Sequence, residues 1–169
     1  MRKLLTALLL IAACAVLAGC SPASASELYS LPQLPDEYIS LQTLIDAELA
    51  EGSEYSSPTG GSNLQAVQQY DLNGDGISEA LAFFRTASGA LKVCVYGSVG
   101  GEYEQLCSIS GEGSFIGRID YTDMDGDGTS ELIAAWQLDG GITLIGAYSM
   151  KNWSGETLLT ANCTAFTEI

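Results

Sequence analysis

Residues 71–79 read DLNGDGISE, and residues 123–131 read DMDGDGTSE. The second stretch begins 52 positions after the first, and each places acidic or amide side chains at its first, third and fifth positions. This repeat offset, applied without gaps, matches these further pairs: EALAFF with ELIAAW, Gly89 with Gly141, and Tyr96 with Tyr148. One offset that holds over 26 positions indicates a duplicated unit and not two chance turns.

Each unit is expected to form four antiparallel strands. EALAFFR and ELIAAWQ are nearly continuous apolar runs, which are typical of strands covered on both faces. ALKVCVYG and ITLIGAYS follow, then EYEQLCSIS and GETLLTANC, while LQAVQQY and FIGRIDYT lead into the acidic stretches. A four-stranded unit of about 50 residues has the size of a propeller blade. The units are assigned to residues 64–113 and 114–169, the second about two residues longer if Trp153 answers Tyr103.

The acidic stretches are predicted to be metal-binding loops. In a tightly curled loop the side chains at positions 1, 3 and 5 converge, glycine at position 6 permits the sharp bend, and the carbonyl of position 7 turns inward. Oxygen ligands in this number favour calcium over zinc or copper. An EF-hand is not expected, because position 12 is Ala82 or Ala134 and strands follow the loops.

The patterns DxNGDGxxE and DxDGDGxxE resemble the calcium loops of FG-GAP and VCBS repeats, which are the blades of integrin-type β-propellers. In that family the side chains at positions 1, 3, 5 and 9, with the carbonyl of position 7, hold the ion. The resemblance covers residues 64–165 and implies two calcium sites with these ligands: Asp71, Asn73, Asp75, Ile77 and Glu79 in the first, and Asp123, Asp125, Asp127, Thr129 and Glu131 in the second. The chain departs from the family in having Glu at position 9, where Asp is usual.

Two other interpretations of the loops stay open at this point. They are either metal-free Asp/Gly turns, or calcium sites in which the ion is only a structural staple. Several carboxylates in one tight loop repel one another, which favours a bound cation. Extracellular calcium modules work with dissociation constants of about 0.1 to 1 mM, so a weak stabilising site is the expected form.

The N-terminus has the order of an export signal. Arg2 and Lys3 precede an uncharged run, Leu4 to Gly19, which ends in LAGC. LAGC resembles the bacterial lipobox. The resemblance implies removal of residues 1–19, a diacylglycerol thioether on Cys20, and attachment to the cell membrane on its extracytoplasmic face. The alternative is an ordinary secretory signal that leaves Cys20 unmodified.

Residues 20–38 are rich in Ser, Ala and Pro and are expected to form a flexible tether. Residues 39–63 hold a short amphipathic helix and a loop, with Ser40 as N-cap and Gly52 as the end of the helix. The predicted fold class is therefore all-β: two four-stranded antiparallel propeller-like blades, a partial β-propeller, preceded by this helix. Propellers close with about four to eight blades. The chain is expected to be a front or truncated part of a longer repeat protein, or a complete one that covers its strand edges by self-association.

Cys94 and Cys107 flank a predicted hairpin whose two-residue turn is Gly100-Gly101. In that register the two cysteines are directly opposite each other in a non-hydrogen-bonded pair, where side chains approach most closely. The sequence predicts either a cross-strand disulfide, which suits an exported protein, or two reduced buried cysteines. Cys163 has no evident partner in the sequence.

The amino-acid composition of the chain limits the classes of function that it can have. The formal net charge of −15 argues against nucleic acid as a partner. The chain has no histidine, which excludes Ser-His and Cys-His nucleophile pairs and disfavours zinc sites. Catalysis by carboxylate groups alone is not excluded by the composition.

Three functions are considered. The first is a non-enzymatic, surface-anchored calcium-binding repeat protein that recognises or adheres to an extracellular protein or glycan. The second is an accessory subunit or fragment of an extracellular carboxylate-dependent hydrolase, with Glu79 and Glu131, or Asp120 and Asp139, as its acid/base pair. The third is a structural envelope protein without a ligand. Four aromatic residues are expected to pack and not to bind: Tyr96, Tyr103, Tyr148 and Trp153.

Overall fold

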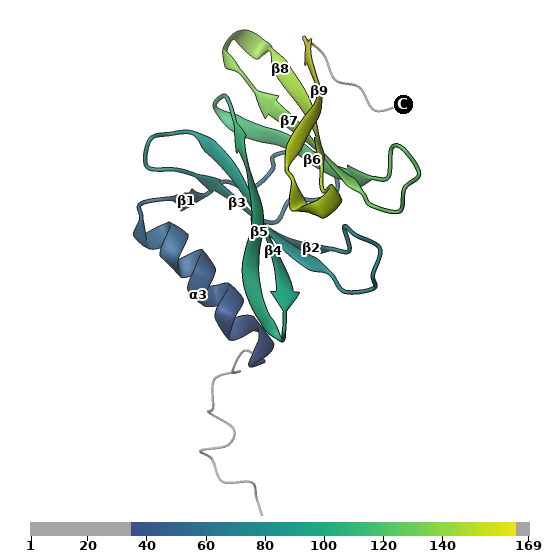
Figure 1. Cartoon of the computed structure of the whole chain (residues 1–169). Helices are drawn as coiled ribbons and strands as arrows, with labels where there is room; N and C mark the ends of the chain where they lie inside the picture. The colour runs from purple at the N-terminus through teal and green to yellow at the C-terminus, as the bar shows by residue number, and fades with distance from the viewer. Residues whose placement is uncertain (1–34, 165–169) are drawn as a thin grey trace, which may run out of the picture. The chain divides into compact units, whose positions relative to one another are not determined.

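The computed structural model describes residues 35–164, which belong to one compact unit that begins at Pro35 (Figure 1). The predicted signal peptide, Cys20 and most of the predicted tether lie outside the described residues. The described residues are mostly β, with two antiparallel sheets and one α-helix, so the prediction of a β protein preceded by a helix is confirmed at this level.

The first sheet, sheet A, is antiparallel and four strands wide. β1 and β2 lie end to end along the same edge of β3, so the sheet counts five strands. After helix α3 (Glu37–Ala50), its strands are β1 (Glu54–Tyr55), β2 (Val67–Tyr70), β3 (Glu79–Arg85), β4 (Leu91–Val99) and β5 (Glu102–Gly111).

The second sheet, sheet B, is also antiparallel and has the strand order β6-β7-β8-β9. Its elements, with two 3-10 turns, are β6 (Phe115–Thr122), β7 (Glu131–Gln137), η1 (Asp139–Gly141), β8 (Thr143–Ser149), η2 (Lys151–Trp153) and β9 (Glu156–Cys163). The repeat offset superposes both ends of β3 on those of β7. It also superposes a β-bulge in each sheet, between residues 95 and 96 and between residues 147 and 148. The duplication seen in the sequence is therefore a duplication of structure.

The offset also persists to the end of each sheet. Leu91 pairs with Gly111 in sheet A, and Thr143 pairs with Cys163 in sheet B. The two partners are equally far apart along the chain in both copies. The expectation that the second copy is about two residues longer is therefore wrong.

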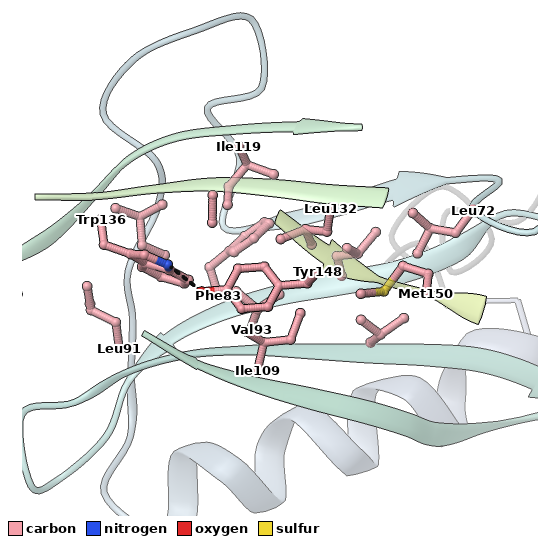
Figure 2. Packing of buried hydrophobic residues seen from close by; sticks show 14 residues of the cluster. Leu72, Phe83, Leu91, Val93, Ile109, Ile119, Leu132, Trp136, Tyr148 and Met150 are labelled. Atoms are coloured by element: carbon pink, nitrogen blue, oxygen red, sulfur yellow. Dashed lines mark hydrogen bonds between the residues drawn. The ribbon is translucent and has the colours of Figure 1, made fainter. Parts of the chain in front are cut away.

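The two sheets pack face to face over one hydrophobic core, which Figure 2 shows from close by. Phe83, Val93 and Ile109 enter the core from sheet A, and Leu132 and Trp136 enter it from sheet B. The indole N–H of Trp136 donates to the hydroxyl of Tyr148 at 2.9 Å, so this buried polar pair is satisfied. Fully burying a side chain of this size contributes about 1.5 to 3 kcal/mol, and this layer holds most of the large buried side chains.

The sheets stack in the same sense, as successive repeats do, and not about a two-fold axis. Leu81 and Phe83 of β3 face the core. Their counterparts by the repeat offset are Ile133 and Ala135, which alternate with the core residues of β7 and so lie on the far face of sheet B. Each copy therefore meets the other through the opposite face of its sheet, which is the arrangement of stacked repeats.

Helix α3 covers the other face of sheet A. Leu41 and Ile45, each 7% exposed, pack on Ala82 and Phe84 of β3, so the predicted short helix is confirmed. The helix begins at Glu37 and not after Ser40, and its first residues carry no side-chain cap. The predicted capping role of Ser40 is therefore wrong, because its hydroxyl accepts the backbone N–H of Tyr103 at 2.8 Å and ties the helix to sheet A.

The predicted pairing of Cys94 with Cys107 is wrong. The hairpin turn is where the sequence places it, but the bulge after Val95 shifts the register by one residue. Cys94 consequently lies opposite Ser108 and packs under α3, while Cys107 lies opposite Val95 and packs on the inter-sheet core. A slip of one residue moves a side chain to the other face of a sheet. Both thiols are free and partly or fully buried, and burial raises the pKa of Cys107 to about 11.

Gly111 tests the packing between the sheets. A methyl group at Gly111 would overlap the indole ring of Trp136, which is fully buried and has no room to move. We expect Gly111→Ala to lower the free energy of unfolding by about 1 to 3 kcal/mol, the usual cost of overpacking. Urea denaturation measures this change. The neighbouring exposed substitution Ser110→Ala is the control and should stay within about 0.5 kcal/mol; equal effects of the two would contradict this packing.

Candidate metal centre

The first acidic loop, residues 71–79, joins β2 to β3 and is held in shape by its own side chains. Asp71 accepts hydrogen bonds from the backbone N–H groups at positions 4 and 6 of the loop, at 2.8 and 2.9 Å. Asn73 and Asp75 each accept the N–H group two residues further on, at 2.9 and 2.7 Å. Such local bonds curl the backbone around the side chains at positions 1, 3 and 5.

The second loop, residues 123–131, repeats these hydrogen bonds one for one. Asp123 accepts from positions 4 and 6 at 2.7 and 3.0 Å. Asp125 and Asp127 each accept the N–H group two residues further on, at 3.0 and 2.9 Å. The position-6 glycines have φ of +86° and +90°, a conformation that side chains with a Cβ rarely adopt. The two loops are therefore the same structure and not only the same composition.

The glutamate at position 9 closes each loop at the start of the following strand. Glu79 is 4% exposed and accepts the N–H of Leu72 at 2.9 Å; Glu131 is 3% exposed and accepts the N–H of Met124 at 2.8 Å. Burial, followed by the nearby carboxylates of the same loop, raises the pKa of Glu79 above its ordinary value, and the hydrogen bond from Leu72 offsets only part of this. A buried carboxylate among other carboxylates is a group that a cation would stabilise.

The second loop brings three carboxylates together. Oxygen atoms of Asp123, Asp125 and Glu131 all lie within 4.8 Å of one another, and no other such acidic cluster occurs in residues 35–164. The donors are oxygens only, which fits calcium, an ion that takes six to eight oxygen ligands. In the first loop the equivalent place of Asp125 is taken by the amide of Asn73, which also offers an oxygen.

The aspartate at position 5 of the second loop forms an ion pair with a lysine of the same chain. Lys151 lies 2.8 Å from Oδ2 of Asp127, which is not a member of the cluster of Asp123, Asp125 and Glu131. The hydrogen bond from Lys151 lowers the pKa of Asp127. The counterpart of Lys151 in the first copy is Val99, so only the second loop has this contact. The second loop has one acidic residue more than the first, and the charge of Lys151 offsets it.

The predicted ligands at position 7, Ile77 and Thr129, lie in the loops as expected. The side chain of Ile77 is a hydrocarbon without a donor atom, so only its backbone carbonyl group can serve a metal site. All eight predicted side-chain ligands accept the loop hydrogen bonds described above, four in each loop.

The two loops are neighbours in space, a relation that sequence reasoning missed. The carbonyl of Leu72 accepts the N–H of Ser130 at 2.7 Å, which joins position 2 of one loop to position 8 of the other. Tyr70 and Tyr121, at the ends of the strands that lead into the loops, stack with ring centroids 4.5 Å apart. The sequence does contain a tyrosine shortly before each acidic stretch. The repeat offset does not superpose Tyr70 on Tyr121, so the sequence did not indicate that they pair.

Comparison with known proteins adds no relative. No protein-family model, curated protein or solved structure matches the chain. Among the described residues, no helix is long and apolar enough to cross a membrane.

The residues at position 2 of the loops give a matched test of their surroundings. Leu72 is fully buried between the sheets, whereas its counterpart Met124 is 57% exposed. We expect Leu72→Ala to cost about 2 to 5 kcal/mol of unfolding free energy, as is usual for a buried leucine, and Met124→Ala to cost less than about 0.5 kcal/mol. Thermal and urea unfolding of both variants measure the difference. Similar losses would show that the loops sit in equivalent environments, which would contradict the same-sense stacking.

Proposed function

We propose that this chain is a calcium-stapled repeat protein of the cell surface, in which each acidic loop holds one calcium ion. The observation that carries the proposal is the repetition of one hydrogen-bonded loop, with the same oxygen donors, at equivalent places in two stacked sheets. Chance turns have no reason to repeat a set of mutually repelling carboxylates.

In this proposal the ligands of the first site are Asp71, Asn73, Asp75, the carbonyl of Ile77, and Glu79. Those of the second site are Asp123, Asp125, Asp127, the carbonyl of Thr129, and Glu131. Bound calcium supplies a positive charge that offsets carboxylate repulsion. The protein's own groups hold the loop closed: the first aspartate accepts the N–H groups of positions 4 and 6, and the buried glutamate at the start of the next strand accepts the N–H of position 2.

The finer fold assignment is also a proposal. Two four-stranded antiparallel sheets that stack in the same sense, each with an acidic loop between its first two full strands, are what FG-GAP and VCBS blades would look like. The matching positions of strands and bulges in the two sheets support the repeat on which this proposal depends. We propose that the chain is a partial β-propeller of this type, with α3 in the place of a preceding blade.

The cellular setting rests on the sequence alone. We propose a lipid anchor on Cys20, which would hold the protein on the extracytoplasmic face of the cell membrane, where calcium is abundant. A recognition or adhesion role toward an extracellular protein or glycan is the use that fits a non-enzymatic anchored repeat protein.

The hydrolase alternative receives no support from the arrangement of its candidate acids. Glu79 and Glu131 each accept a backbone N–H of their own loop. Asp120 forms an ion pair with Arg118, with 2.5 Å between Oδ2 and Nε. An acid/base pair needs carboxyl groups that can exchange protons with a substrate across a shared space.

Calcium titration tests the staple. For sites with dissociation constants of about 0.1 to 1 mM, about 10 mM calcium adds about 1 to 3 kcal/mol per site to the free energy of unfolding. For two sites we expect this to raise the melting temperature of residues 21–169 by about 6 to 20 °C, because a domain of this size shifts by about 2 to 4 °C per kcal/mol. Calorimetry should find two sites in the wild type and one each in Asp71→Asn and Asp123→Asn.

Asp139→Asn is the control, since Asp139 is exposed in η1 and outside both loops. It should keep two sites and the full shift. No heat of binding and no change in melting temperature at about 10 mM calcium, a concentration well above the expected dissociation constants, would refute the staple.

Lipidation is tested in growing bacterial cells that express the full chain. A radiolabelled fatty acid should be incorporated into the wild type and lost in Cys20→Ser, since only Cys20 would carry the lipid. Cys14→Ser, within the predicted signal peptide, is the matched control and should keep the label. A wild-type chain that is exported without label would rule out the anchor.

A further inference from the structure

Lys151 places a positive charge beside the second acidic loop. Its ammonium group is 2.8 Å from Oδ2 of Asp127, and the charges of Asp125 and Glu131 attract it as well. The other carboxylate oxygen of Asp127, Oδ1, accepts the backbone N–H of Thr129 at 2.9 Å. Both oxygens of this predicted calcium ligand are therefore already engaged, and one of them is engaged by a cation.

The first loop has a neutral partner at the same place. Oδ1 of Asp75 accepts the backbone N–H of Ile77 at 2.7 Å, as in the second loop, but Oδ2 accepts the uncharged side-chain amide of Asn73 at 3.0 Å. Val99, the counterpart of Lys151 by the repeat offset, ends β4 and has an uncharged side chain. The contact with Lys151 therefore distinguishes the second loop from the first.

The turn η2 fixes the backbone of Lys151 near the loop. Met150, just before it, is 1% exposed in the core between the sheets (Figure 2), and Trp153, two residues after it, packs against the same core. The backbone N–H of Lys151 donates to the hydroxyl oxygen of Ser149 at 3.2 Å. The side chain of Lys151, in contrast, is 63% exposed, so it can leave Asp127 without disturbing the core.

The ion pair bears on how many carboxylates are ready for a calcium ion. Asp123, Asp125 and Glu131 already converge, whereas Asp127 lies outside their cluster. Calcium can recruit Oδ2 of Asp127 only after Lys151 has moved, and a lysine that stays nearby still repels the ion. The affinity of calcium sites depends on the charge of their surroundings. Without calcium, the same lysine offsets part of the repulsion among the carboxylates.

We propose that Lys151 is a built-in counter-ion of the second loop, which stabilises the loop without calcium and lowers the affinity of the loop for calcium. This inference rests on the proposed function, because it concerns the ion in the same loop. The two effects separate it from a purely structural role, since a lysine that only supported η2 would not weaken calcium binding. At the first loop the equivalent place holds Val99, so calcium binding there should depend far less on Lys151.

Calorimetric calcium titration of residues 21–169 tests the inference one site at a time, because Asp71→Asn leaves only the second site and Asp123→Asn leaves only the first. We expect Lys151→Met to tighten the second site at least about threefold, since it removes a charge that repels the ion, and to change the first site less than about twofold. Lys151→Arg keeps the charge and should keep the wild-type affinity. In chelator, Lys151→Met should melt about 1 to 3 °C below the wild type, the small loss expected for an exposed ion pair.

Lys92→Met is the matched control. It removes the same charge from the chain, but Lys92 pairs with Glu48 of α3, on the side of sheet A that faces away from sheet B. It should leave both affinities unchanged, and melting curves establish that all variants are folded. A second site that is no tighter in Lys151→Met, or a melting temperature in chelator that is no lower, would overturn the inference. A wild type that binds calcium in neither loop would instead refute the proposed function, and the inference with it.

Discussion

The apolar layer between the two sheets is the contact on which the rest of the described structure depends. A four-stranded sheet of this length cannot bury both of its faces alone, and Phe83 and Trp136 find their cover only in the other copy. Because the copies meet through opposite faces, the layer also sets a direction. One end of the stack needs a cap, which α3 provides, and the other end keeps an apolar face of the same kind.

The same layer brings the acidic loops together. Leu72 belongs to the first loop and to the core at once; its backbone N–H donates to Glu79, and its carbonyl oxygen accepts the N–H of Ser130 in the second loop. Anything that orders one loop therefore acts on the packing between the sheets. Calcium would stabilise the stack from its edge, without touching the core.

The strands could be predicted from the sequence, but the faces that pack together and the cysteine pairing could not. The repeat offset reproduces both ends of β3 in β7, the first residue of β4 in β8 and the last residue of β5 in β9, because similar sequences fold into similar units. It cannot reveal which face of each sheet lies inside, since EALAFFR and ELIAAWQ are apolar on both faces. The bulge after Val95 has no composition signal, and it was enough to separate Cys94 from Cys107. In the loops, the positions of the oxygen ligands were predictable from their spacing. The contact of Lys151 with Asp127 was not predictable, because it depends on the turn η2 after β8.

The central claim is that an ion lies inside each of the two repeated loops and joins the strands that flank it. Diffraction from crystals grown in calcium, with anomalous difference maps, examines this most directly. The account predicts one peak in each loop, with oxygen atoms of the first, third, fifth and ninth residues about 2.3 to 2.6 Å from it. Well-ordered loops without a peak, in crystals that hold millimolar calcium, would contradict it.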